Sequence, residues 1–494
     1  MRIQNPIIPG FHPDPSICRV GDDFYLVTSS FEYFPGVPVF HSRDLVNWRQ
    51  VGHCLTRHSQ LPLANARASG GIYAPTLRYH NGWFYMITTN VTDGGHFYVR
   101  TQDPAGEWSE PFWLPGGGID PSLLFDEDGQ VYFTYTSGGI VQRLIDAESG
   151  QSLSDERPLW AGTGGQWPEG PHLYHIGDWY YLLISEGGTE YGHMLTIARS
   201  HSPWGPFEAC PTNPILTHRS TNSPIQATGH GDLVQSPDGR WWMVFLGIRP
   251  HGHWPCHNLG RETFLAPVTW EDGWPLVGKA GVAEGERVPL ADELPGQVGA
   301  PEALPEVFQA SGLGMQWNFL RNLEPDCWSF DASTHCLRLM GRAPGLDEAA
   351  ALAWVGRRQL DFEDSLQVEL RFEPRDEHEE AGLVVWMNER HHYEIYVTLR
   401  GGKRVLAARR RIGSLSAEVG QVVAPEGPLL LKVSAITELY QLLWGAPGSA
   451  LQTLAAGETR YLATETAGGF TGVYFACYAT GNGQICQSPA VFTL

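Results

Sequence analysis

The first half of the chain repeats one local pattern five times, and this repeat limits the fold more than any other feature of the sequence. Each copy consists of a short apolar run, a turn centred on glycine, and a run rich in aromatic residues. The copies begin at residues 14, 74, 120, 170 and 230. A hairpin repeat with a period of roughly 45 to 60 residues is typical of the blades of a β-propeller. The sequence therefore predicts a five-bladed β-propeller over residues 1–275.

The residue that opens each copy is expected to face the propeller axis, because the first strand of a blade lines the central channel. Asp14, Asp120 and His230 open three copies, while Ala74 and Gly170 open the other two. Two acids and a histidine should therefore face one cavity. An Asp-Pro pair before a strand is also ordinary turn chemistry, so this pattern alone leaves both interpretations of the two acids open.

A third acid, Glu186, is expected to join them. It ends the aromatic run of the fourth copy, where the first three copies end in Ser or Asn. Because hairpin strands are antiparallel, this end lies near the start of the first strand. Crowded carboxylates push one another's pKa values apart, and such groups can protonate a leaving oxygen and activate water in glycoside hydrolysis. Glu169 is a competing acid, but it stands one residue before a strand opening and therefore just outside the expected channel register.

Composition excludes several classes of partner. The 494 residues include 33 Lys plus Arg against 54 Asp plus Glu, which gives a formal net charge of -21. This charge repels phosphate backbones and anionic lipid surfaces, so neither nucleic acid nor a membrane is expected as a partner. The aromatic content of 12% suits both blade packing and stacking on sugar rings.

The cysteines and the N-terminus predict a cellular location. The eight cysteines contain no C-x-x-C pair and form no dense framework, so we expect buried thiols in a reducing compartment. Met1 leads directly into Asn5-Pro-Ile-Ile-Pro, without the apolar core of a signal peptide. If Met1 is the true start, these features predict a cytoplasmic protein.

The chain changes character after the repeats. Residues 276–310 are rich in Pro, Gly and Glu and are predicted to form a connector. Residues 311–494 lack the blade pattern, but short runs alternate apolar and polar residues, as in 366–372. This alternation predicts an all-β second domain, a β-sandwich.

Seven segments, in order along the chain, resemble glycoside hydrolase family 43. They are His12-Pro-Asp-Pro-Ser-Ile, Ser69-Gly-Gly-Ile-Tyr-Ala-Pro, Gly118-Ile-Asp-Pro-Ser-Leu, Glu169-Gly-Pro-His-Leu-Tyr, Ser185-Glu-Gly-Gly-Thr, Gly229-His-Gly-Asp-Leu and Leu259-Gly-Arg-Glu-Thr. The chain looks most similar to the β-xylosidases and α-L-arabinofuranosidases that carry a C-terminal β-sandwich. This resemblance implies a concanavalin/lectin-like sandwich that packs on the propeller. The resemblance implies an exo-acting, inverting hydrolase that releases xylose and/or arabinose from the non-reducing ends of short xylan- or arabinan-derived oligosaccharides.

The resemblance also implies roles for individual residues. Asp14 matches the general base and Glu186 the general acid, while Asp120 matches the acid that orients the substrate and tunes the pKa of its partner. Arg261 matches an arginine that contacts sugar hydroxyls and pairs with the orienting Asp, and Phe31 matches an aromatic wall of the terminal sugar site.

Two further positions bear on the sugar and on a metal. Tyr73 stands where many xylosidase relatives have Trp, which leaves the choice between xylopyranose and arabinofuranose open. His230 matches an axial histidine, expected to contact substrate, that in some relatives lies beside a bound calcium or a water cluster. The acid–base chemistry requires no cofactor, and calcium at the axis is the one metal that the resemblance suggests.

Alternatives remain at the level of function and of the second domain. An endo-arabinanase would have an open groove and generally lacks the sandwich, and the three acids argue against a non-catalytic sugar-binding propeller. The sandwich is expected to narrow the mouth of the active site, with Gly468-Gly-Phe-Thr-Gly as the candidate loop, and the competing interpretation is an independent carbohydrate-binding module. The expected partner is an oligosaccharide substrate, and relatives often form homo-oligomers.

Overall fold

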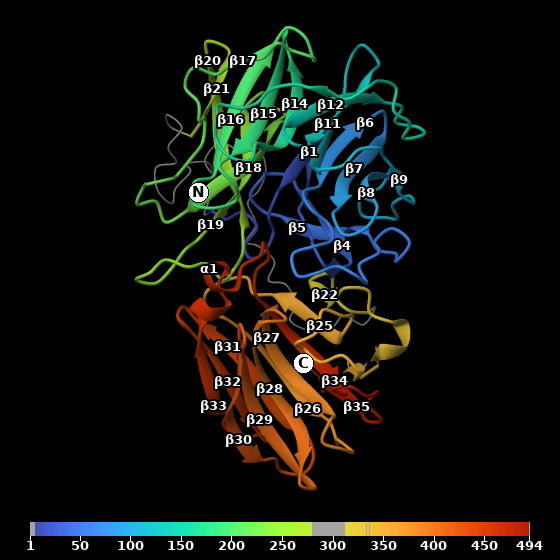
Figure 1. The fold of residues 1–494 in the computed structure, drawn as a ribbon, viewed down its shortest axis with the longest axis vertical. Helices are drawn as coiled ribbons and strands as arrows, with labels where there is room; N and C mark the ends of the chain where they lie inside the picture. Colours follow the sequence, from blue (N-terminus) through green and yellow to red (C-terminus); the bar gives the residue numbers. More distant parts are fainter. Residues whose placement is uncertain (1–4, 279–311, 332, 335, 494) are drawn as a thin grey trace.

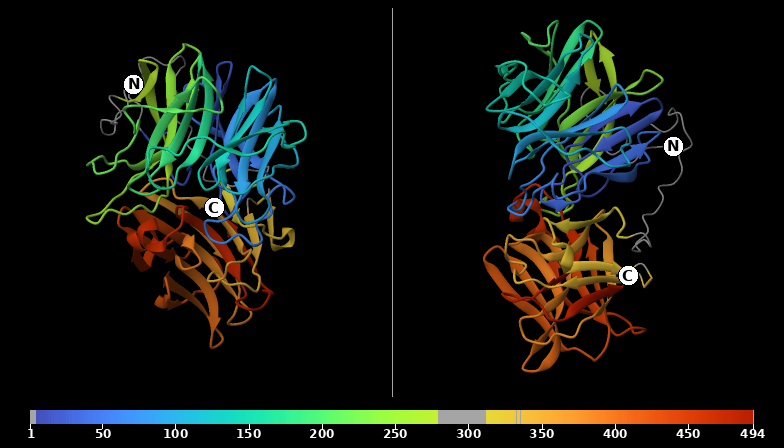
Figure 2. Two further views of the ribbon diagram at one scale, coloured as in Figure 1. Left: turned by 45° about the horizontal axis from the view of Figure 1, so that its top comes forward. Right: turned by 90° about the vertical axis from the view of Figure 1, so that its right-hand side faces the viewer.

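The computed structural model describes residues 5–278, 312–331, 333–334 and 336–493. Two all-β units are stacked, with the N-terminal unit above and the C-terminal unit below in Figure 1, and the side view in Figure 2 separates them clearly. The predicted connector at 276–310 lies outside the described residues except for 276–278, of which 276 and 277 complete the last strand of the N-terminal unit.

The N-terminal unit is a five-bladed propeller, as the repeat predicts. Each blade is a four-stranded antiparallel sheet whose strands follow chain order. Blades 1 and 2 contain β1 (Ser16–Val20), β2 (Asp23–Val27), β4 (Gly36–Ser42) and β5 (Arg49–Leu55), then β6 (Thr76–His80), β7 (Trp83–Asn90), β8 (Gly95–Thr101) and β9 (Phe112–Trp113). Blade 3 contains β10 (Ile119–Phe125), β11 (Val131–Thr136), β12 (Ile140–Ile145) and β13 (Arg157–Pro158). Blades 4 and 5 contain β14 (Glu169–Ile176), β15 (Trp179–Glu186), β16 (Met194–Ser200) and β17 (Glu208–Ala209), then β18 (Gln226–Gln235), β19 (Trp241–Ile248), β20 (Glu262–Glu271) and β21 (Trp274–Val277).

The apolar middle strands follow from the way blades pack face to face. In β19, Met243 and Phe245 belong to the core shared with blade 4, while Trp242 and Val244 belong to the core shared with blade 1. Successive side chains of a strand point to opposite faces. A strand that is covered on both faces must therefore be apolar at every position, which explains the continuous aromatic and aliphatic runs of the repeat.

The start of the chain closes the ring. The N–H groups of Ile7 and Ile8 donate to Thr263 O at 2.9 and 3.3 Å, and Thr263 N–H donates back to Ile8 O at 3.2 Å. The Asn5 side chain exchanges two hydrogen bonds with the backbone of Leu265. The first described residues are thus fastened to β20 of the last blade.

The C-terminal unit is a sandwich of two antiparallel sheets, as the alternation predicts. One sheet has the order β3 (Tyr33–Phe34), β22 (Trp317–Leu320), β25 (Ala353–Arg358), β34 (Tyr474–Thr480), β27 (Glu380–Asn388), β28 (His391–Arg400), β29 (Lys403–Ile412) and β30 (Leu415–Val423). The other has the order β23 (Trp328–Asp331), β24 (Cys336–Met340), β35 (Pro489–Thr493), β26 (Asp364–Arg371), β31 (Leu429–Ile436), β32 (Leu439–Gly445) and β33 (Gln452–Glu458). Three short helical turns are η1 (Pro325–Cys327), η2 (Thr459–Leu462) and α1 (Thr464–Ala467). The alternating residues Leu366, Val368, Leu370 and Phe372 are all buried in the core between the sheets.

One strand of the sandwich comes from the propeller part of the chain. Strand β3 lies between β2 and β4 in sequence, yet it pairs with β22, with Tyr33 opposite Leu320 and Phe34 opposite Phe319. The fully buried Arg321 continues the contact, because its N–H donates to Glu32 O at 2.8 Å. The two units therefore share a sheet.

The sequence predicts buried thiols, and the structure agrees for most of them. All eight cysteines are free thiols, and seven are buried, with Cys336 partly exposed. Among the helices in the described part of the chain, none is long and apolar enough to cross a membrane.

Candidate active site

Four of the five residues that open the blades share an unusual backbone conformation. Asp14, Asp120, Gly170 and His230 have φ angles of 54°, 55°, 58° and 44°. A left-handed conformation costs an L-residue roughly 1–2 kcal/mol, and such strain concentrates at functional sites. Strands β10, β14 and β18 also lose their pairing register at these residues. Because a bulge of this kind redirects side chains, the blade openings are built to aim groups at the axis.

Asp14 is a buried carboxylate held by a cation. Arg261 Nη1 donates to its Oδ1 at 2.8 Å, and Ser29 Oγ donates to its Oδ2 at 2.5 Å. Burial alone would raise the pKa of Asp14, but the Arg261 guanidinium, His230 and the Ser29 hydrogen bond outweigh it and lower that pKa below its usual value. Asp14 is therefore ionised at neutral pH. The sequence prediction paired Arg261 with Asp120, and this was wrong, because the guanidinium binds Asp14.

The pKa of Asp120 is shifted in the opposite direction from that of Asp14. It is buried and accepts a hydrogen bond from Gly170 N–H at 3.1 Å. Burial, followed by the charges of Glu169 and Asp14, raises the pKa of Asp120 well above its usual value. The structure thus brings Asp120 close to Asp14, as predicted, and adds Glu169 to the group.

Glu169 immediately precedes the residue that binds Asp120. Its side chain is 19% exposed, and its Oε1 lies 3.7 Å from His193 Nε2. Burial and the charge of Asp14 raise the pKa of Glu169 to about 7, although Arg261 opposes this shift. A carboxyl group with this pKa holds its proton for part of the time at neutral pH, so Glu169 and Asp14 differ in protonation within one site.

Glu186 does not join Asp14 and Asp120, contrary to the prediction from the hairpin. Its carboxylate is fully buried and accepts hydrogen bonds from four donor groups. These are Thr163 N–H at 3.0 Å, Thr163 Oγ at 3.0 Å, Gly165 N–H at 2.8 Å and Thr196 Oγ at 2.6 Å. The end of β15 does lie near the axis, since Ser185 Oγ accepts from His230 N–H at 2.7 Å. Because side chains alternate along a strand, the next residue, Glu186, points to the other face.

The register of blade 4 shows which acid shares the face of Ser185. In the pairing of β14 with β15, Glu169 is directly opposite Ser185. Residues that are directly opposite in an antiparallel pair have their side chains on the same face. Glu169, which the sequence placed just outside the channel register, therefore lies on the axial side.

Aromatic rings from both units surround the arginine. The ring centroid of Phe31 lies 5.2 Å from that of Tyr73 and 6.2 Å from that of Phe470, and the Arg261 guanidinium lies 5.7 Å from the rings of both Phe31 and Phe470. Tyr73 is fixed because its hydroxyl donates to Ser69 O at 3.1 Å. Phe31 and Tyr73 thus lie beside Arg261, which in turn binds Asp14.

The sandwich contacts the site through Phe470. Its N–H donates to Ser69 Oγ at 2.8 Å, and its carbonyl oxygen accepts from Arg261 Nη2 at 3.4 Å. Ser69 is itself held by Glu32, whose Oε2 accepts from Ser69 N–H at 3.0 Å. The sequence pointed to the segment 468–472 without choosing a residue, and Phe470 is the residue that contacts the site.

His230 lies on the axis, with its Nδ1 4.0 Å from Asp14 Oδ1. Burial lowers the pKa of His230, although the charge of Asp14 opposes this shift. Calcium takes six to eight oxygen ligands, and the described residues include no cluster of three or more His, Cys, Asp or Glu side chains that could hold a metal ion. The side chains at the axis therefore do not form a calcium cage by themselves.

A second polar cluster on the inner strands was not predicted. Asp232 accepts hydrogen bonds from Ser16 Oγ at 2.6 Å, Tyr174 OH at 2.6 Å and Ile17 N–H at 3.0 Å, and its Oδ2 lies 2.8 Å from Arg78 Nη1. Burial alone would raise the pKa of Asp232, but Arg78, together with the Ser16 hydrogen bond, holds that pKa far below its usual value. The available signal was position, since 16 and 232 stand two residues after the blade openings and so share their face.

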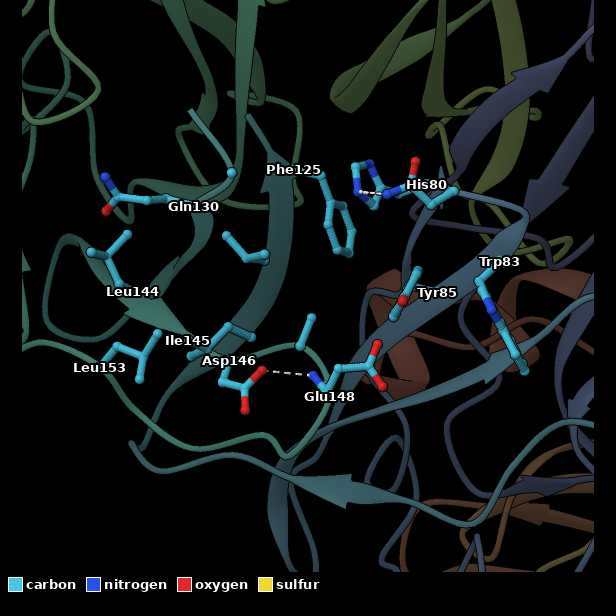
Figure 3. Close-up of a pocket in the computed structure, with 14 residues that line it drawn as sticks. His80, Trp83, Tyr85, Phe125, Gln130, Leu144, Ile145, Asp146, Glu148 and Leu153 are labelled. Atoms are coloured by element: carbon cyan, nitrogen blue, oxygen red, sulfur yellow. Dashed lines mark hydrogen bonds between the residues drawn. The ribbon is translucent and has the colours of Figure 1, made fainter. Parts of the chain in front are cut away.

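A separate cavity of about 440 Å³ lies between blades 2 and 3 (Figure 3). It is formed at the β6–β7 and β10–β11 turns and the end of β12, and its labelled lining residues are His80, Trp83, Tyr85, Phe125, Gln130, Leu144, Ile145, Asp146, Glu148 and Leu153. These residues are different from those around Asp14, so the cavity is not part of the acidic site.

Comparison with known proteins gives matches to both units. Residues 3–275 match "Glycosyl hydrolases family 43", and residues 306–494 match "Beta xylosidase C-terminal Concanavalin A-like domain". The chain is 45% identical over 500 residues to the non-reducing end α-L-arabinofuranosidase BoGH43B of Bacteroides ovatus, covering 99% of this chain and 93% of that protein. It is 38% identical over 509 residues to a xylosidase/arabinosidase of Butyrivibrio fibrisolvens, covering 97% and 96% of the two chains.

Solved structures agree in fold over the whole chain. The Bacteroides ovatus xyloglucan PUL GH43B structure has a TM-score of 0.95 at 44% identity and covers 100% of this chain and 98% of that chain. The xylan β-1,4-xylosidase of Bacillus halodurans has a TM-score of 0.92 at 34% identity and covers 99% of both chains.

Proposed function

The chain belongs to glycosyl hydrolase family 43 and is a glycoside hydrolase, and we propose that it releases terminal L-arabinofuranose or D-xylose from the non-reducing ends of short oligosaccharides, with inversion. This proposal rests on one observation above all. The site holds two carboxyl groups with separated pKa values, Asp14 lowered and Glu169 raised to about 7. Two carboxyl groups of this kind serve as the general base and the general acid in glycoside hydrolysis.

Asp14 acts as the general base. Its ionised carboxylate is held in place by Arg261 and Ser29, so it can take a proton from a water molecule that attacks the anomeric carbon. Inversion needs roughly 6.5–9.5 Å between the two carboxyl groups, because the water must fit between the base and the sugar.

Glu169, in place of Glu186, acts as the general acid. Its raised pKa keeps a proton available for the glycosidic oxygen as the bond to the leaving group breaks. Glu186 has no comparable freedom, since both of its oxygens are engaged by Thr163, Gly165 and Thr196. We assign Glu186 a structural role, which is to anchor the 162–165 loop to β15.

Asp120 orients the reacting groups. The Gly170 N–H that binds Asp120 belongs to the peptide unit that follows Glu169, so the position of one carboxyl group is linked to that of the other. The charge of Glu169 is also the largest charge contribution to the raised pKa of Asp120. Asp120 is therefore coupled to the acid electrostatically and helps to hold its direction.

The sandwich supports cleavage from a chain end. Phe470 reaches Arg261 and stacks near Phe31, so a loop of the second unit forms part of the acidic site. This contact favours a narrowed site over an independent carbohydrate-binding module and over the open groove of an endo-acting enzyme. Of the two sugars, L-arabinofuranose is favoured by the 45% identity to a protein named as a non-reducing end α-L-arabinofuranosidase.

The test compares 4-nitrophenyl α-L-arabinofuranoside with 4-nitrophenyl β-D-xylopyranoside, using the wild-type protein and Asp14→Asn. We expect turnover of at least one substrate by the wild type, greater for the arabinofuranoside, and its loss in the variant. NMR of the first product formed should show the inverted anomer. A folded wild-type protein that cleaves neither substrate, or that releases the retained anomer, would contradict the proposal.

A further inference from the structure

An exposed tryptophan stands beside the proposed general acid. Trp167 is two residues before Glu169, and its side chain and backbone together are 60% exposed. Its φ angle is 48°, in the left-handed region that bulky residues rarely adopt. Backbone strain of this kind is retained where the surrounding structure enforces it, often at ligand-binding positions.

The ring of Trp167 is backed by the main chain of a neighbouring loop. A Cβ atom added to Gly188 would lie 2.7 Å from Trp167 Cε3, so the indole packs directly on this glycine. The adjoining residues are tied together as well, because Gly187 N–H donates to Gln166 O at 2.7 Å. One side of the indole is therefore held against backbone while the residue as a whole stays largely open to solvent.

The same loop reaches the catalytic arginine. Thr189, which follows Gly188, accepts a hydrogen bond at its Oγ from Arg261 Nη1 at 3.2 Å, and Arg261 in turn binds Asp14. Tyr191 of this loop donates to Glu465 Oε1 of the sandwich at 3.1 Å. The support of Trp167 is thus fixed at one point to the active site and at another to the second unit.

We propose that Trp167 is the stacking platform for the leaving-group sugar, the residue just beyond the bond that is cleaved. The inference rests on the proposed function, in which Glu169 protonates the glycosidic oxygen, so the leaving group must lie on the Glu169 side of the site. Phe31, Tyr73 and Phe470 are gathered instead around Arg261 and Asp14. A flat aromatic face with rigid support is suited to stacking on a sugar ring.

The test uses two substrates that both need protonation but differ in the leaving group. One is a disaccharide, arabinobiose or xylobiose according to the sugar that the wild type prefers, and the other is the methyl glycoside of the same sugar, which has no second ring. In Trp167→Ala we expect kcat/KM to fall roughly tenfold on the disaccharide, as for the loss of one aromatic contact. On the methyl glycoside we expect no change, and Trp167→Phe should restore most of the loss.

Trp113→Ala is the matched control. Trp113 is also exposed, at 42%, and its ring also packs on a glycine, Gly94, but it lies on β9 at the outer edge of blade 2. This variant should leave both substrates unaffected. An equal loss on both substrates in Trp167→Ala, or no loss on the disaccharide, would overturn the inference. If the wild type cleaves neither substrate, the proposed function itself has failed, and this result is distinguishable because it does not depend on Trp167.

Discussion

Two groups of buried acids lie on the inner strands of the propeller, and they differ in how fully their charge is compensated. Asp232 accepts hydrogen bonds from Ser16, Tyr174 and a backbone N–H and pairs with Arg78. The site around Asp14 instead gathers Asp120 and Glu169 as well, with Arg261 bound to Asp14. The first arrangement lowers a pKa and joins blades, whereas the second pushes pKa values apart and leaves protons to exchange. The candidate active site is therefore the group of acids whose charges are incompletely balanced.

The largest effect is expected from Asp14→Asn. The change removes the base while keeping the shape of the side chain, so kcat/KM should fall by about 10²- to 10⁴-fold. Thermal unfolding should show that the variant is folded. A variant that is folded and retains activity within tenfold of the wild type would remove Asp14 from the mechanism.

Asp232→Asn should act on stability. It leaves Arg78, whose side chain is only 17% exposed, without its charge partner, which costs about 3 kcal/mol in the free energy of unfolding. Urea denaturation measures this cost, and Asp120→Asn is the matched variant, expected to lose activity with far less loss of stability. Because the folded-state pKa of Asp232 is depressed, its stabilisation is present above the unfolded-state pKa of about 3.9 and is lost as the pH falls below that value. Equal stability losses in the two variants would refute the contrast between the clusters.

Glu169→Gln and Glu186→Gln separate the two candidate acids. Glu169→Gln should reduce kcat/KM by about 10²-fold on a disaccharide and much less on an activated nitrophenyl glycoside, whose leaving group needs little protonation. Glu186→Gln should lower the melting temperature, since it replaces an acceptor of hydrogen bonds from Thr163, Gly165 and Thr196 with an amide. If the dependence on the leaving group is found in Glu186→Gln instead, Glu186 is the general acid, as the resemblance implied.

The smallest effect is a shift in the pH profile. Activity needs Glu169 protonated, so kcat/KM should decline as the pH rises through about 7, and this limb should disappear in Glu169→Gln.

Arg261 lowers the pKa of Asp14, so Arg261→Met should raise that pKa and move the acidic limb to higher pH. An acidic limb that stays in place or moves to lower pH would show that Arg261 does not control the ionisation of the base.

Local patterns in the sequence were sufficient for the fold and for part of the site. The five hairpins follow from strand periodicity, and the openings at Asp14, Asp120 and His230 follow from it too. The proposed general acid, Glu169, could not be predicted in this way, because β14 loses its register between Glu169 and His172. An inserted residue reverses the alternation on which the prediction depended, and it moved Glu169 onto the axial face.

Contacts between distant segments were also beyond local reasoning. Phe470 binds Ser69 across 401 residues, and Arg261 binds Asp14 across 247. From the sequence, a pair of Arg261 with Asp14 could not be distinguished from a pair of Arg261 with Asp120, because both acids open a blade and face the same axis. The cytoplasmic location and the homo-oligomer stay predictions from the sequence.

The shared strand β3 has a consequence for anyone who divides the gene. A protein that ended at residue 278 would lack β22, so the backbone groups of Tyr33 and Phe34 that pair with it would become an unprotected sheet edge, which invites aggregation. The catalytic half cannot be trimmed to a smaller enzyme at that point, and exchanging the sandwich between relatives would require Tyr33 and Phe34 to be exchanged with it.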